Sequence, residues 1–299
     1  MQIQGIHDTA YTIGIAQGCS FTGTVNGTPY NSPENFFEAA AKNTTGESTF
    51  TIKRNIGSKA PGTTLEVGDI VFSDGSATPY AEGLKLNKTQ KDSAVAIIFY
   101  KGTDCSDDGS TRTLGIGIHN SAENGTDGRL MWTTYNKRED DILSIKCTPK
   151  ETTFGESAIT NNFTGVKNGS NNWTSLCSED HSAAANAADY YPAFYWANNY
   201  SSSYNLTGSF ANGWYLPSIA EMYYIYWSLT TINASLELLN RTKLKEVDNG
   251  DDGADYWASS EYGNGSGCTW YVAIGCKYIN YNYKNWQKYV CSIREFPSN

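Results

Sequence analysis

The sequence has few of the residues that bind metals or form reactive centres. Its three histidines, His7, His119 and His181, lie far apart, and its seven cysteines include no C-x-x-C pair. A zinc site needs about four such ligands at set spacings, so the sequence predicts no metal and no cofactor. Because the number of cysteines is odd, they cannot all pair within the chain, and the sequence leaves the disulfide pattern open.

Positive charge and long apolar segments are also scarce. The chain has 22 Lys and Arg against 31 Asp and Glu, a net charge of −9. Nucleic acids and anionic membranes attract basic surfaces, so we expect neither as a partner. No apolar run approaches the length of a transmembrane helix, and we expect no direct membrane insertion.

Gly, Asn, Ser, Thr and Tyr are abundant, which is typical of a loop-rich fold with short strands. Residues 1–62 give few signals and are expected to form an N-terminal segment packed on a main domain, residues 63–299. Strands are predicted by the following segments: Thr49–Lys53, Val67–Phe72, Ala94–Tyr100 and Thr113–His119. The third is almost entirely apolar and predicts a strand buried on both faces, whereas the fourth alternates.

Several helix starts are marked by capping residues. Ser32 and Tyr191 each precede a proline, and Asn87 and Ser218 are each followed three residues later by Gln or Glu. Apolar residues after Ser218 recur at helical spacing, which predicts a main helix there. A second main helix is expected after Asn233. The pattern therefore favours a mixed α+β domain.

The stretch from Tyr256 to Phe296 combines a strand frame with an unusual filling. Strands are predicted over Trp257–Ser260, Trp270–Ile274 and Tyr289–Phe296. Alternation along the second strand directs Trp270, Val272 and Ile274 into the core and Tyr271 and Ala273 outward.

The filling between these strands is rich in Tyr and Asn and has little apolar content besides Ile279 and the aromatic rings. Tyr supplies large, rigid contact area and Asn supplies adaptable hydrogen bonding, a mixture typical of binding loops. The alternative is a polar surface loop without a role. The many aromatic residues favour a contact surface, because exposed apolar patches usually have a partner.

The order YWASSEY, then Trp270, a polar run with Lys284, and YVCSIREF resembles the variable region of proteins diversified by retroelements, of the treponemal type. Three further segments, GDIVFSDGSATPYAEGLKL, AVAIIFYKGTDC and TRTLGIGIH, also resemble these proteins, so the likeness covers most of the chain. The element GWYLPSIAE, followed by YWASSEY, is similar to C-type lectin-like domains of the formylglycine-generating-enzyme type.

The resemblance implies a C-type lectin-like α+β domain with short twisted antiparallel sheets, two main helices and long loops. The variable region would span about residues 256–296. In this family, frame residues stay constant while reverse transcription randomises template adenines at variable positions. The frame residues would be Trp270, Lys284, Tyr289, Val290, Arg294 and Phe296.

The variable positions that the resemblance implies would bind the ligand. They are Tyr271, Ala273, Gly275, Cys276, Tyr278, Asn280, Tyr281, Asn282, Tyr283, Asn285, Trp286, Gln287 and Lys288. The aromatic members would act as anchors, the Asn and Gln members as hydrogen-bonding contacts, and Ala273, Gly275 and Cys276 would set the shape.

The genetic code provides a check on these positions. Randomised adenines of an Asn codon yield Tyr, Ala, Gly, Cys or Asn, but never Trp, Gln or Lys. Trp286, Gln287 and Lys288 therefore need another template codon or are not variable, and Lys277 stands where the family usually has Gly.

The implied function is ligand recognition by a bacterial surface receptor or adhesin, not catalysis. The partner would be a protein or a glycan on another cell or host. The first residues lack the features of a signal peptide, and Ile15–Cys19 faintly resembles a lipoprotein cleavage box without a preceding hydrophobic segment. The resemblance implies a lipid-anchored surface protein whose anchor is absent from this chain. The ligand and the oligomeric state are left open.

Two alternatives remain. Formylglycine-generating enzymes use a cysteine pair, and Cys268, Cys276 and Cys291 lie in the corresponding third of the chain, but no His lies near them in the sequence to activate a thiol. The acidic run Asp248–Asp255 offers oxygen ligands for calcium, although its spacing is not that of an EF-hand. The other interpretation of this run is a solvated loop.

Overall fold

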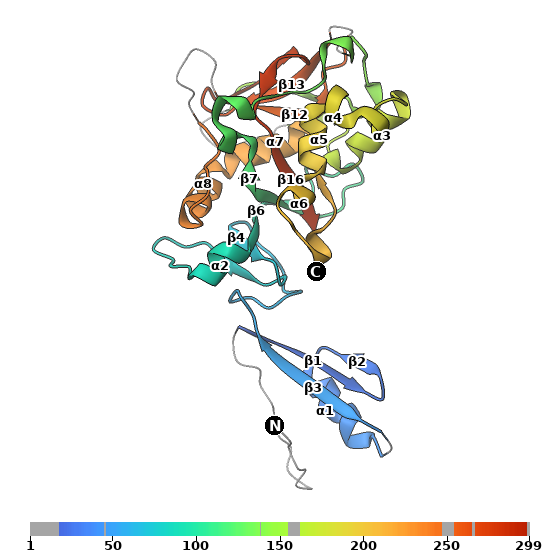
Figure 1. Cartoon of the computed structure of the whole chain (residues 1–299), viewed down its shortest axis with the longest axis vertical. Helices are drawn as coiled ribbons and strands as arrows, with labels where there is room; N and C mark the ends of the chain where they lie inside the picture. The colour runs from blue at the N-terminus through green and yellow to red at the C-terminus, as the bar shows by residue number, and fades with distance from the viewer. Residues whose placement is uncertain are drawn as a thin grey trace.

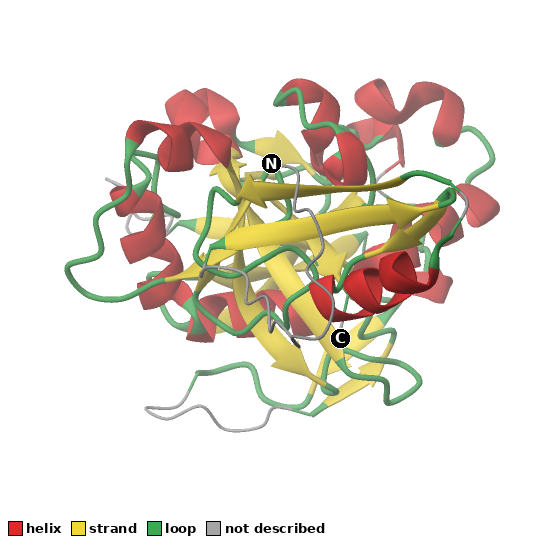
Figure 2. Ribbon diagram, turned by 90° about the horizontal axis from the view of Figure 1, so that it is seen from below, coloured by secondary structure: helices red, strands yellow, loops and turns green. Residues whose placement is uncertain are grey.

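The computed structural model describes residues 18–44, 46–137, 139–154, 162–246, 254–264 and 267–297 of the chain. These residues form a mixed α+β structure with eight α-helices and five antiparallel sheets of two to six strands. Helices lie around the outside of the strands in both views (Figures 1 and 2). No helix in these ranges is long and apolar enough to cross a membrane.

The first described residues form a small unit with its own core. Its elements are β1 (Cys19–Val25), β2 (Thr28–Tyr30), α1 (Pro33–Lys42) and β3 (Ser48–Arg54), with strand order β2-β1-β3. Phe21, Val25 and Phe36 are buried together, with Phe50 packed on them. Gly23 allows this packing, because a Cβ at that position would lie 2.4 Å from the Phe36 ring. The predicted strand over residues 49–53 and the Ser32 cap are confirmed, whereas the sequence signals missed β1 and β2.

The largest sheet has six strands in the order β11-β16-β7-β6-β4-β5. They are β4 (Asp69–Phe72), β5 (Ala77–Pro79), β6 (Ala94–Gly102), β7 (Arg112–Asn120), β11 (Trp214–Tyr215) and β16 (Cys291–Phe296). Burial of β6 on both faces is confirmed. Strand β7 is buried from Arg112 to Ile118 although its sequence alternates, because both of its faces are covered. Leu114, Ile116 and Ile118 belong to one hydrophobic cluster, and Phe296 and Tyr200 of another cluster lie over the glycines between them.

The remaining helices surround this sheet. They are α2 (Lys88–Ser93), α3 (Asn172–Glu179), α4 (Ala187–Tyr190), α5 (Pro192–Asn198), α6 (Tyr200–Ser203), α7 (Ile219–Trp227) and α8 (Leu229–Leu238). The capping boxes at Asn87 and Ser218 are both formed. The second main helix begins at Leu229, four residues before the expected Asn233. Helices α1, α2, α5 and α7 begin at the predicted starts, whereas the sequence signals missed α3, α4 and α6, because such short helices give weak signals.

Three smaller sheets and six short 3-10 segments complete the described fold. The sheets contain β12 (Asp255–Glu261), β13 (Cys268–Ala273) and β14 (Tyr278–Tyr283); β8 (Leu130–Met131) with β15 (Gln287–Lys288); and β9 (Cys147–Pro149) with β10 (Phe163–Gly165). The 3-10 segments are Ser121–Gly128, Tyr135–Lys137, Leu143–Ile145, Gly169–Asn171, Ala184–Asn186 and Gly208–Phe210.

Helix α7 joins the large sheet to the β12-β13-β14 sheet, since it contacts β6 on one side and β12 and β13 on the other. Its first turn carries Glu221, whose Oε1 lies 2.7 Å from Nη1 of Arg112 on β7, and both side chains are buried. Trp270, Val272 and Ile274, which alternation directs into the core, are buried as predicted. The following hydrophobic residues are buried as well: Trp214, Leu216, Ile219, Trp257, Val290, Ile293 and Phe296.

Candidate functional site

The candidate site is the β13-β14 hairpin with the turn that follows it, residues 268–287. Strand β13 lies between β12 and β14 (β12 and β13 are labelled at the top of Figure 1). Trp270 and Val272 pack in the same core as α7, while Tyr271 and Ala273 pack against Trp257 and Val290 on the opposite face. The expectation that Tyr271 and Ala273 point outward is therefore wrong, because a second hydrophobic cluster covers that face.

Two buried lysines hold the end of this region in place. Lys284 Nζ lies 2.9 Å from Glu261 Oε1, with neither side chain exposed, and 5.2 Å from the centre of the Trp132 ring. Burial raises the pKa of Glu261 to about 7, although Lys284 acts in the opposite direction. Lys288 Nζ lies 2.6 Å from Asp255 Oδ2 and 3.7 Å from the centre of the Tyr271 ring.

The burial of Lys284 and Lys288 bears on their expected roles. Both lysine side chains lose the mobility of a surface lysine. An unpaired charge at either position would destabilise the folded state. A buried, paired lysine suits a frame position, as expected for Lys284. The same geometry does not suit the ligand contact that was predicted for Lys288, because its side chain is buried and paired.

The other positions that were predicted to vary are mostly accessible. Gly275 and Cys276 lie in the tight turn between the strands, and both are exposed. Tyr278, Asn282 and Asn285 are half-buried. The exposed members of β14 and the following turn are Asn280, Tyr281, Tyr283, Trp286 and Gln287.

Three large aromatic side chains cluster within six residues of sequence. Tyr281, Tyr283 and Trp286 are 45%, 48% and 50% exposed. The Tyr281 ring stacks on Tyr262 with the ring centres 4.0 Å apart, and its edge meets Trp270. Tyr262 was missed as a site residue, although it ends the YWASSEY motif.

The β14 positions that were predicted to vary do not share one face. Tyr281 lies opposite Trp270 on β13, and Asn280 lies opposite Tyr271. Because successive strand residues point to opposite faces, Tyr281 and Tyr283 lie on one face of β14, and Tyr278, Asn280 and Asn282 lie on the other. Each set is accessible because β14 is the outermost strand of its sheet.

A hollow of about 490 Å³ lies beside β14. It is lined by Thr152, Thr153, Tyr262, Trp270, Tyr278, Ile279, Asn280 and Tyr281. None of these side chains carries a charge at neutral pH, so the hollow suits uncharged groups. Thr152 and Thr153 come from a distant part of the chain, and no sequence signal marked them.

Lys277, at the end of the hairpin turn, has a positive φ of 59°. Glycine adopts this backbone conformation without strain, whereas residues with a Cβ are disfavoured there. The expectation that a glycine is usual at this position therefore has a local physical reason.

The cysteines of the alternative thiol mechanism occupy three different elements. Cys268 is on β13, Cys276 is in the hairpin turn, and Cys291 is on β16 of the large sheet. Burial raises the pKa of Cys291 to about 12. A thiol needs an environment that lowers its pKa to become a nucleophile at neutral pH, so the setting of Cys291 opposes that role.

The proposed calcium ligands in residues 248–253 lie outside the described residues. Asp255 is described, and its carboxylate accepts a hydrogen bond from Lys288. Within the described ranges, no group of three or more His, Cys, Asp or Glu side chains is placed to hold a metal ion.

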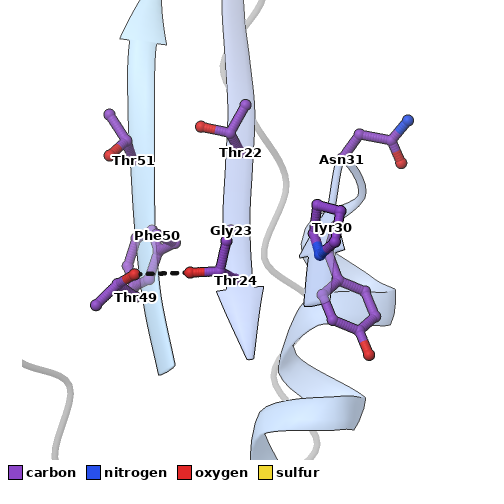
Figure 3. A pocket seen from close by; sticks show the side chains of 9 residues that line it. Thr22, Gly23, Thr24, Tyr30, Asn31, Thr49, Phe50 and Thr51 are labelled. Carbon is purple, nitrogen blue, oxygen red and sulfur yellow. Dashed lines mark hydrogen bonds between the residues drawn. The ribbon is translucent and has the colours of Figure 1, made fainter. Parts of the chain in front are cut away.

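A second hollow, of about 480 Å³, lies on the N-terminal unit. Figure 3 shows threonines of two neighbouring strands around it, Thr22 and Thr24 on β1 and Thr49 and Thr51 on β3. The hydroxyl groups of Thr24 and Thr49 are 3.0 Å apart. These short side chains leave the sheet face open on the side opposite α1, and sequence patterns gave no hint of this hollow.

Comparisons with known proteins give little further information. No family model matches the chain, and no curated protein matches it. A solved structure of a fimbrial protein from Bacteroides ovatus is similar, with 14% identity and a TM-score of 0.46. The match covers 93% of this chain and 64% of that protein, so this chain spans less than two thirds of its length.

Proposed function

We propose that this chain is a ligand-recognition protein of the retroelement-diversified type, with a C-type lectin-like main domain. The observation that carries the proposal is the contrast within one short stretch. Tyr281, Tyr283 and Trp286 are each about half exposed, while the neighbouring Trp270 and Lys284 are buried. A binding surface with changing side chains needs a fixed frame beneath it, and this arrangement has both parts.

The accessible members of the variable positions would make the contacts. Half-exposed tyrosine and tryptophan rings offer large contact area at low entropic cost, and Asn280 and Gln287 offer hydrogen bonds beside them. Tyr271, Ala273 and Lys288 would act by shaping the support, since they are buried. A receptor or adhesin role at the cell surface, with a lipid anchor, belongs to the same proposal.

The test is to sequence this locus, with its flanking DNA, across many cells of the source population. We expect substitutions to concentrate at the accessible positions between Gly275 and Gln287, to trace to template adenines, and to spare Trp270 and Lys284. Position 288 should also be constant, because its lysine is buried and paired. An invariant stretch without a nearby template copy would refute diversification.

A further inference from the structure

The outer edge of β14 and of the residue before it has two parts, residues 277–279 and residues 280–283. Its first part is paired with an extended segment of the same chain: the Ile279 N–H donates to the Thr152 carbonyl at 2.6 Å, and the Phe154 N–H donates to the Lys277 carbonyl at 3.0 Å. In an antiparallel strand, alternate residues direct their N–H and C=O groups to the same edge. The backbone N–H groups of Tyr281 and Tyr283 therefore point to the outer edge too.

These two N–H groups are bound by side chains of the strand itself. The Tyr281 N–H donates to Asn280 Oδ1 at 2.9 Å, and the Tyr283 N–H donates to Asn282 Oδ1 at 2.8 Å. Each asparagine thus caps the amide of the residue that follows it. Asn280 is exposed and Asn282 is half-buried, so both side chains can turn away when another acceptor arrives.

Along this second part of the edge, the flanking side chains are accessible on both faces. The Tyr281 and Tyr283 rings stand on one face, and the asparagines on the other. A strand lying beside β14 would place every second side chain next to the tyrosine rings. An extended polypeptide carries alternating amide donors and carbonyl acceptors that match such an edge, and a glycan has no such array.

We infer that the outer edge of β14, from Asn280 to Tyr283, is a docking site for an extended polypeptide segment of a partner protein. The segment adds to the sheet beyond Thr152–Phe154, and its carbonyl groups replace the asparagine oxygens on the Tyr281 and Tyr283 amides. The inference rests on the proposed recognition function and specifies its ligand class. Backbone pairing supplies affinity that does not depend on the variable side chains, and the tyrosine rings supply selectivity.

The two asparagines compete with the partner in this arrangement. Exchanging one hydrogen bond for another yields little net free energy, so removing a cap should favour the incoming strand. We expect Asn280→Ala and Asn282→Ala each to tighten peptide binding by about fivefold. This direction is unusual, because alanine at a contact residue normally weakens binding.

The probe is a displayed library of random linear peptides, selected against the purified chain. The affinity of selected peptides is then measured for the wild type, Asn280→Ala, Asn282→Ala and the double variant. Asn212→Ala is the matched control, since Asn212 is an exposed side-chain amide outside the candidate site. Amide hydrogen exchange at Tyr281 and Tyr283 should quicken in the unliganded variants and slow again with peptide, which verifies both the cap and the docking.

Peptide backbones provide a second test. N-methylation at every second amide should abolish binding in one alternating set and be tolerated in the other, because only one set faces β14.

Weaker binding in both asparagine variants would mean that these side chains touch the ligand, which overturns edge docking while leaving recognition intact. Selection of no linear peptide, together with binding to a glycan array, would also overturn it. So would self-association of the double variant without peptide, which would assign the edge to a second copy.

Failure of the proposed function has a different signature. In that case peptides would bind with equal affinity to Tyr281→Ala and to the wild type, because the exposed ring would not contribute to selectivity.

Discussion

Strands β13 and β14 are neighbours of equal length and similar aromatic content, yet they have opposite environments. Every residue of β13 is buried, whereas β14 has one buried residue, Ile279. The difference follows from their place in the sheet: β13 has a strand on each side and a hydrophobic cluster on each face, while β14 is at the edge. Aromatic composition therefore does not separate a buried strand from an exposed one. Position in the sheet does.

One large effect is expected from removing a buried charge next to the two strands. Lys284→Met would leave Glu261 without its ion-pair partner, and we expect a loss of about 3 kcal/mol in the free energy of unfolding at pH 8. Chemical denaturation measures this loss. The double variant Glu261→Leu with Lys284→Met should recover most of the stability; an equally unstable double variant would show that the lysine acts through packing.

Truncating one ring on each strand tests the comparison directly. Trp270→Ala should cost about 3–5 kcal/mol, because the side chain is buried among core residues. Tyr281→Ala should cost about 1 kcal/mol, mainly through its stack on Tyr262. Thermal and denaturant unfolding give both values. Similar costs for the two variants would contradict the contrast between a buried β13 and an exposed β14.

The raised pKa of Glu261 predicts how stability changes with pH. Between its ordinary value of 4.5 and the folded value of about 7, the unfolded chain loses this proton while the folded chain keeps it. Stability should therefore fall as pH rises through this window, by up to about 3 kcal/mol from this group, and level off above it. The difference in unfolding free energy between the wild type and Glu261→Gln isolates the effect. A difference that does not vary with pH would show that the carboxyl titrates normally.

The smallest expected change in stability concerns Lys277, in the turn between the two strands. Lys277→Gly should relieve the strain of a positive φ and stabilise the fold by roughly 0.5–1 kcal/mol. Lys277→Ala serves as the control, since it removes the same charge and long chain but keeps a Cβ. If alanine stabilised the chain as much as glycine does, backbone strain would not be the cause.

Local sequence patterns predicted much of the fold where nearby residues decide the structure. The caps at Ser32, Asn87 and Ser218 formed as expected, since each depends on a side chain reaching an amide three residues along the chain. The buried run of β6 was equally clear. Short helices such as α4, and strands β1 and β2 with their polar residues, gave signals too weak to detect.

The sequence predicted which segment holds the candidate site, but not which of its side chains are exposed. The sequence identified the aromatic residues of β14 and the buried lysine at 284, but placed Tyr271 and Ala273 outside the core. Alternation tells which residues share a face, but not whether both faces are covered. Tyr262, Thr152 and the capping role of Asn280 depended on contacts between segments distant in sequence or on the strand being at an edge.

By itself, the sequence determined the helices that begin with capping residues, many hydrophobic residues of the core, and the segment where exposed aromatic residues gather. The tertiary structure alone decided which of those residues are accessible, that Lys284 and Lys288 are paired inside the fold, and that β14 is the end strand of its sheet. The physical reason is that propensity and capping act over a few residues. Burial, ion pairing and edge exposure depend on what the rest of the chain places alongside.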